Sequence, residues 1–228
     1  MCARLRAIGY LVAISAALPQ TAETVRASAE PRVAVRVVAT TGQDDQIVAG
    51  MFRELVSTWQ RCGVTVLPYA QGLEPPPTAT VSLILAPGWP PPEAAGGLGW
   101  IRFVLDPESH PAPVLMVSLA ATRALVDASD YRGTPVAQRP SAVGRTLLAR
   151  ALGRAAAHEL GHYLLASRAH ALRGLMRARF NADELVSEDG AAFRLADSDR
   201  QALKICLREA RFLTADAGAA PSCGVPRI

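Results

Sequence analysis

The residues with the clearest chemical potential form one short run, His158-Glu159-Leu160-Gly161-His162. In a helix, residues i and i+4 lie on the same face, so His158 and His162 can present imidazole nitrogens to one metal ion. Glu159 projects about a quarter-turn away, where its carboxylate can act as general base toward a water molecule at the metal. This H-E-x-x-H pattern is typical of zinc-dependent hydrolases. Two histidines on a solvated helix face are the alternative interpretation.

The flanks of the motif favour the metal-binding interpretation. The uncharged run Ala155-Ala156-Ala157 precedes the motif. Three of the four histidines of the chain lie close together, between His158 and His170. Apolar residues and the two motif histidines recur at spacings of three and four, which predicts one inward-facing stripe: Leu148, Ala151, Ala155, His158, His162 and Leu165. An imidazole inside such a stripe needs a partner.

A catalytic zinc site needs a third protein ligand, and His170 is the nearest candidate. If the helix continued, eight residues would carry His170 about 12 Å beyond His162. The chain must therefore turn back between about Leu165 and Ala169. His110, in a proline-flanked loop, is interpreted as an ordinary surface histidine.

The elements that position these residues follow from periodicity and turn signals. Strands are expected at 31–40, 64–70, 78–86, 100–105 and 113–119. Helices are expected from Asp44 or Asp45 to about Arg61, at 120–128, from Pro140-Ser141 through the motif with Ser141 as the cap, and at 197–213. This order predicts a single α/β domain over residues 30–228, with a helical C-terminal part.

The motif and its downstream residues resemble the metzincin branch of the zincin metallopeptidases. The family pattern is H-E-x-x-H-x-x-G-x-x-H followed by a methionine-containing turn. His158, Glu159 and His162 match its first three functional positions, and Met176, after Gly174-Leu175, looks like the methionine of that turn. The chain departs from the pattern after His162, because Leu165 stands at the glycine position, Arg168 stands at the third-histidine position and His170 follows two residues later.

This resemblance implies a zincin-like α/β fold with a mixed, twisted five-stranded sheet, an active-site helix and a helical C-terminal subdomain. It implies Zn²⁺ held by His158, His162 and His170, Glu159 as general base, and a peptide or protein substrate. The expected strand at 100–105 would be the cleft edge that pairs with an extended peptide. Glu184 or Glu188 as third ligand would resemble the gluzincin arrangement instead. The rival function is a zincin-fold, metal-containing binding or scaffold protein without significant turnover.

The N-terminus predicts export. Arg4 and Arg6 precede an uncharged run from Ile8 to Leu18, and Ala27-Ser28-Ala29 fits a cleavage site, so residues 1–29 read as a signal peptide. The mature chain is expected to be secreted or periplasmic, as in the uncharacterised exported bacterial proteins of zincin type that it resembles. No later segment is long and apolar enough to span a membrane. The 24 basic residues exceed the 20 acidic ones only slightly and are scattered among few aromatics, which argues against nucleic-acid binding.

Export would leave Cys62, Cys206 and Cys223 in an oxidising compartment. An odd count predicts one disulfide and one spare thiol. Cys206–Cys223 is the expected pair, because it would tether the tail to the last helix. The alternative is a cysteine switch, because the segment from Pro221 to Pro226 resembles the matrixin propeptide sequence whose thiolate caps the zinc.

Overall fold

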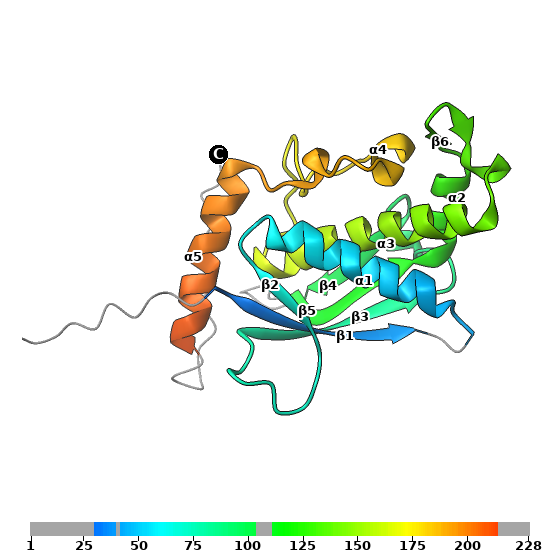
Figure 1. Cartoon of the computed structure of the whole chain (residues 1–228). Helices are drawn as coiled ribbons and strands as arrows, with labels where there is room; N and C mark the ends of the chain where they lie inside the picture. Colours follow the sequence, from blue (N-terminus) through cyan, green and yellow to red (C-terminus); the bar gives the residue numbers. More distant parts are fainter. Residues whose placement is uncertain (1–29, 40–41, 104–110, 214–228) are drawn as a thin grey trace, which may run out of the picture.

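The computed structural model describes residues 30–39, 42–103 and 111–213. Figure 1 shows a twisted sheet with α1 and α3 side by side on one face, while α5 stands at the end of this layer. The strands are β1 (Arg32–Ala39), β2 (Thr65–Pro68), β3 (Ala79–Ala86), β4 (Gly99–Phe103), β5 (Pro111–Ser118), β6 (Asp130–Tyr131) and β7 (Thr134–Pro135). The α-helices are α1 (Asp45–Gln60), α2 (Leu119–Asp127), α3 (Ser141–Leu164), α4 (Ala182–Val186) and α5 (Asp197–Leu213). The 3₁₀ turns are η1 (Pro92–Ala94), η2 (Val136–Gln138) and η3 (Ala191–Phe193).

The main sheet has the order β2-β1-β3-β5-β4, and β4 is the antiparallel member at one edge. The other neighbouring strands are parallel, with Val35 opposite Val81 and Leu83 opposite Leu115. Alternate residues of β3, such as Leu83 and Leu85, are buried, which is the period-two pattern of a strand with one covered face. The predicted α/β class and the mixed five-stranded sheet are confirmed.

Helix α1 shows how local sequence determines an element. The side chain of Asp44 accepts a hydrogen bond from the backbone N–H of Gln46, which caps the helix start. Met51, Leu55 and Trp59 on its inner face are fully buried. The indole N–H of Trp59 donates to the carbonyl of Ala157 at 3.1 Å, so α1 is fixed to α3 one residue before the motif.

Helix α3 runs from Ser141 to Leu164 and carries the motif in its last turns. The predicted cap is wrong: Pro140 occupies the N-cap position, no side chain caps the helix, and Ser141 is already helical. The predicted stripe is buried except for the half-buried His158, but residues outside it are buried too, including Leu147, Leu152 and Ala156. α3 is therefore a central helix enclosed on most sides by the sheet, α1, α2 and α4.

The C-terminal part consists of the segment with α4 and η3, followed by α5. The helix predicted at 197–213 is confirmed with its boundaries. Ile205 is 44% exposed, whereas Leu203 and Cys206 are buried. In the part of the chain that the structure describes, no helix has the length and apolar character to cross a membrane. The expected signal peptide at residues 1–29 lies outside the described residues.

Candidate metal centre

Three histidines from two elements converge at the end of α3. His158 and His162 come from the helix, and His170 comes from the loop that follows it. One ring nitrogen from each lies within 4.8 Å of those of the other two. The ring centroids of His158 and His170 are 5.3 Å apart, and those of His162 and His170 are 4.9 Å apart. A continuous helix would have carried His170 away from the other two histidines, so the turn after α3 is what assembles the cluster.

That turn is built from local backbone geometry. Leu165 is the helix C-cap, and Ala166 adopts a left-handed conformation with φ of 46°. The N–H of Ser167 then donates back to the carbonyl of His162 at 3.2 Å. This reversal lies within the predicted interval from Leu165 to Ala169. An alanine occupies a position that glycine usually takes, which explains why the stop signal was weak in the sequence.

The protein backbone holds both motif imidazoles in one orientation. Nδ1 of His158 lies 2.7 Å from the carbonyl oxygen of Leu175, and Nδ1 of His162 lies 2.7 Å from that of Ser167. A carbonyl can only accept, so each ring carries its proton on Nδ1 and leaves Nε2 with a free lone pair. Burial, and then the neighbouring His162, lower the pKa of His158 to about 4. Burial likewise lowers the pKa of His162, so both rings are neutral near pH 7.

The two Nε2 atoms face each other at a distance of 3.0 Å. Two lone pairs without a proton between them repel, and a shared cation removes that conflict. Zinc–nitrogen bonds of about 2.0–2.1 Å in a tetrahedral site correspond to nitrogens roughly 3.3 Å apart. The Nε2 atoms of His158 and His162 lie close to this spacing. A modest movement of His170 would bring the third nitrogen within bonding distance of the same ion. Three neutral imidazoles are also a donor set that suits zinc. The residues present therefore fit the ion that the motif implies.

Glu159 is buried beside the histidines, against the edge of the sheet. Its side chain is 5% exposed. A Cβ on Gly99, the first residue of β4, would lie 2.7 Å from Cγ of Glu159 and 3.0 Å from its Oε1. Within the described part of the chain, its carboxylate makes no hydrogen bond or ion pair. This burial raises its pKa to about 8. A desolvated carboxyl group with a high proton affinity is suited to proton transfer.

Met176 packs directly against the helix turn that carries the ligands. Its side chain is 1% exposed. Its carbonyl accepts the N–H of Ala171 at 2.8 Å, so the segment after His170 folds back on itself. The fold of this segment requires glycine at position 174. Gly174 has a φ of +80°, and a side chain there would collide with the carbonyl of Arg194.

The structure does not bring the alternative ligands to the cluster. The carboxylate of Glu184 pairs with Arg177 and closes a capping box with Asn181. Glu188 lies at the surface and forms an ion pair with Arg132 at 2.8 Å. His110 is outside the described residues.

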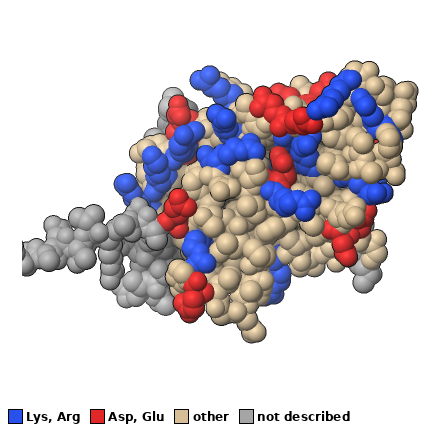
Figure 2. Space-filling model, viewed as in Figure 1, with Lys and Arg blue, Asp and Glu red and all other residues tan. Residues whose placement is uncertain are grey.

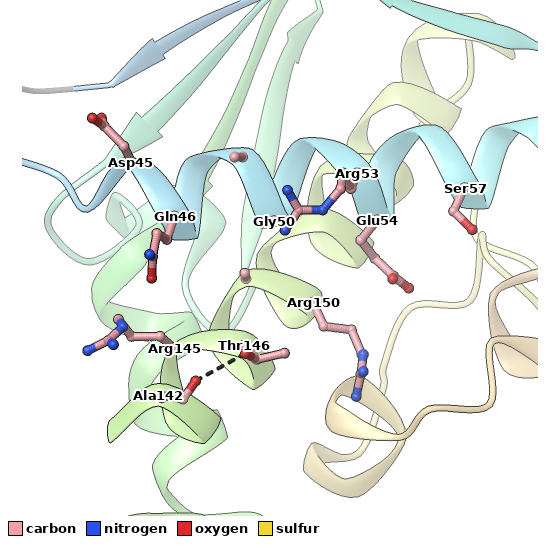
Figure 3. A pocket seen from close by; sticks show the side chains of 12 residues that line it. Asp45, Gln46, Gly50, Arg53, Glu54, Ser57, Ala142, Arg145, Thr146 and Arg150 are labelled. Carbon is pink, nitrogen blue, oxygen red and sulfur yellow. Dashed lines mark hydrogen bonds between the residues drawn. The ribbon is translucent and has the colours of Figure 1, made fainter. Parts of the chain in front are cut away.

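A separate hollow lies between the N-terminal halves of α1 and α3, with a volume of about 710 Å³ (Figure 3). Arg53, Arg145 and Arg150 line it together with Asp45 and Glu54. In Figure 3, the side chain of Glu54 projects from α1, and the side chain of Arg150, on α3, points away from α1. Basic and acidic side chains intermix over the helices on this face (Figure 2). The hollow contains no histidine or cysteine, so we place the chemistry at the histidine cluster.

Sequence reasoning missed the groups that support the cluster. The carbonyl of Leu175 carried no signal at all, because the sequence does not show backbone acceptors. Phe180, whose ring meets that of His158 edge-on at 5.9 Å, resembled any other core residue. Arg154 did carry a signal, since it is a lone charge in an otherwise apolar stretch one turn before His158.

No protein-family model matches the chain, and no curated protein sequence matches it. Among solved structures, the chain is similar to archaemetzincin from Methanopyrus kandleri. The two are 15% identical, with a TM-score of 0.45, and the match covers 81% of this chain and 99% of that one.

Proposed function

We propose that this chain is an exported zinc-dependent metallopeptidase. The observation that carries the proposal is the pair of facing Nε2 atoms at 3.0 Å, with a third histidine and the buried carboxylate of Glu159 beside them. His158, His162 and His170 would hold the ion, and Met176 would take the role of the methionine below the ligands. Residues 1–29 would be removed on export.

The chain's own residues supply the proton chemistry. When bound, zinc would acidify a water molecule at its open position and polarise the scissile carbonyl. Glu159 accepts one proton of the water as the water oxygen bonds to the carbonyl carbon, and delivers that proton to the nitrogen of the leaving amine. The carbon–nitrogen bond breaks as that proton arrives, so atoms and charges balance. Glu159 packs against Gly99 and is 5% exposed, so bulk water has little access to its carboxylate.

The edge strand β4 is the proposed substrate platform. It ends the described sheet on the side where Gly99 contacts Glu159. An extended peptide added to this edge would run past the carboxylate and the histidines. The previously expected strand end at 104–105 lies outside the described residues.

The test is metal analysis together with peptide-cleavage profiling of the purified mature chain. We expect one zinc per chain, cleavage products from unstructured peptides, and loss of cleavage on chelation with recovery on adding zinc. Stoichiometric zinc without any cleavage would favour the scaffold alternative. A chain that binds no zinc would overturn both.

A further inference from the structure

Arg154 is buried in the interior one helical turn before His158, with a side chain that is 1% exposed. Its Nε donates to Glu54 of α1 at 2.9 Å. Nη1 donates to the carbonyls of Glu184 at 2.6 Å and Leu185 at 3.2 Å, and Nη2 donates to that of Asp189 at 3.5 Å. One guanidinium therefore binds α3 to both α1 and the segment that follows the cluster.

The segment held by Arg154 leads through the backbone to a metal ligand. A few residues after its last contact, the carbonyl of Arg194 accepts the N–H of Leu175 at 2.8 Å. The carbonyl of the same Leu175 accepts the Nδ1 proton of His158 at 2.7 Å. The orientation of this ring therefore depends on where the held segment lies.

A second connection runs through aromatic rings. The guanidinium of Arg154 lies 4.3 Å from the ring centre of Phe193. Phe193 stacks on Phe180 at 4.8 Å with an interplanar angle of 18°, and Phe180 meets the ring of His158 edge-on at 5.9 Å. Stacked rings at these distances are attractive and restrict each other's orientation.

Both connections end on the same imidazole. We propose that Arg154 is a positioning residue of the metal centre, which fixes the tautomer and orientation of His158 through the Leu175 carbonyl and the Phe193–Phe180 stack. His162 is independent of this relay, because its Nδ1 is held by the carbonyl of Ser167. A guanidinium is suited to the role, because it makes several directed hydrogen bonds while its face stacks on an aromatic ring. That a metal binds here rests on the proposed function, whereas the effect of Arg154 on the orientation of His158 does not.

The test uses the double variant Glu54→Met/Arg154→Met, which removes the buried pair without leaving one charge unpaired. Arg150→Met is the matched control. Arg150 lies one turn earlier on α3 and donates to the carbonyl of Val186 in the same segment at 2.6 Å, but its contacts do not include the ring stack. Phe193→Leu is a second test variant, which interrupts the stack and keeps both charges.

Two readouts apply to each variant. The first is the dissociation constant for Co²⁺, measured by competition with a chelator. The second is the tautomer of each histidine in the metal-free protein, from long-range ¹H–¹⁵N spectra. We expect Co²⁺ affinity to fall about 10–100-fold in the double variant, as for losses of groups that orient ligands, and less than about threefold in Arg150→Met. His158 should lose its single Nδ1–H form while His162 keeps it.

The inference is overturned if His158 keeps that form and the Co²⁺ affinity stays within about threefold of the control. If the double variant does not fold, Phe193→Leu decides, because an unchanged His158 spectrum and unchanged Co²⁺ affinity there would exclude the stacking connection. A wild-type chain that binds no Co²⁺ would overturn the proposed function, and the tautomer spectra would still decide the relay.

Discussion

Gly161 and Met176 are in direct contact: a Cβ on Gly161 would lie 2.2 Å from Sδ of Met176 and 3.0 Å from its Cε. Gly161 lies between Leu160 and His162 of the motif. Only glycine fits there, because the buried side chain of Met176 fills the space that a larger side chain would need. The helix turn with the ligands and the segment after His170 thus pack without a gap.

Gly161→Ala should displace Met176 and disturb the centre. An added methyl group in a packed interior destabilises by about 1–3 kcal/mol, and here it also moves a segment that holds His158 through the Leu175 carbonyl. Thermal unfolding and zinc titration of the variant would measure both effects. Gly144→Ala on the same helix is the control, because a Cβ there meets nothing within 4 Å. It should gain about 0.5–1 kcal/mol. Equal, favourable effects of the two substitutions would contradict the packing account.

His170→Ala should lower zinc occupancy about as much as His162→Ala, since three ligands are needed for a tight site. Glu184→Ala should retain full zinc occupancy, because that carboxylate is already bound to Arg177 and Asn181. Metal analysis after dialysis at fixed free zinc compares the three variants. Full zinc in His170→Ala together with loss in Glu184→Ala would show that the third ligand is misassigned.

His158 should stabilise the metal-free protein less as the pH falls through the range in which its ring gains a proton. Its folded-state pKa is about 4, below its ordinary value of 6.5, because burial disfavours the charged ring. The neutral ring therefore stabilises the fold fully above pH 6.5, and this contribution disappears as the pH falls toward 4. The loss is on the order of 3 kcal/mol. Burial raises the pKa of the neighbouring Glu159, whose contribution to stability therefore changes in the opposite direction. Urea unfolding should thus compare the two proteins: between pH 6.5 and 4, wild type should lose stability relative to His158→Gln. A constant difference between the two proteins would contradict the assignment.

Features with local causes could be predicted from the sequence. Asp44 begins α1 as its cap, and the helix at 197–213 has the predicted boundaries. The strand predicted at 78–86 is β3, which runs from Ala79 to Ala86. Each of these depends on neighbours within a few residues.

Features with distant causes could not be predicted. The burial of Arg154 depends on Glu54 and on carbonyls about thirty residues downstream, and periodicity contains no sign of them. Ile205 is exposed because α5 packs through Leu203 and Cys206 instead. No strands were predicted for the hairpin of β6 and β7, whose tip residues Arg132 and Gly133 both have positive φ. The pairing of Cys206 with Cys223 stays a prediction, because Cys223 lies outside the described residues.

The most direct measurement of the central claim is zinc content and peptide hydrolysis in Glu159→Ala, side by side with wild type. The three histidines keep their positions in this variant, so we expect zinc to be retained. Hydrolysis should fall by at least about 100-fold, because the variant lacks the buried carboxylate that would transfer the proton. Hydrolysis at the wild-type rate in the zinc-loaded variant would contradict the account.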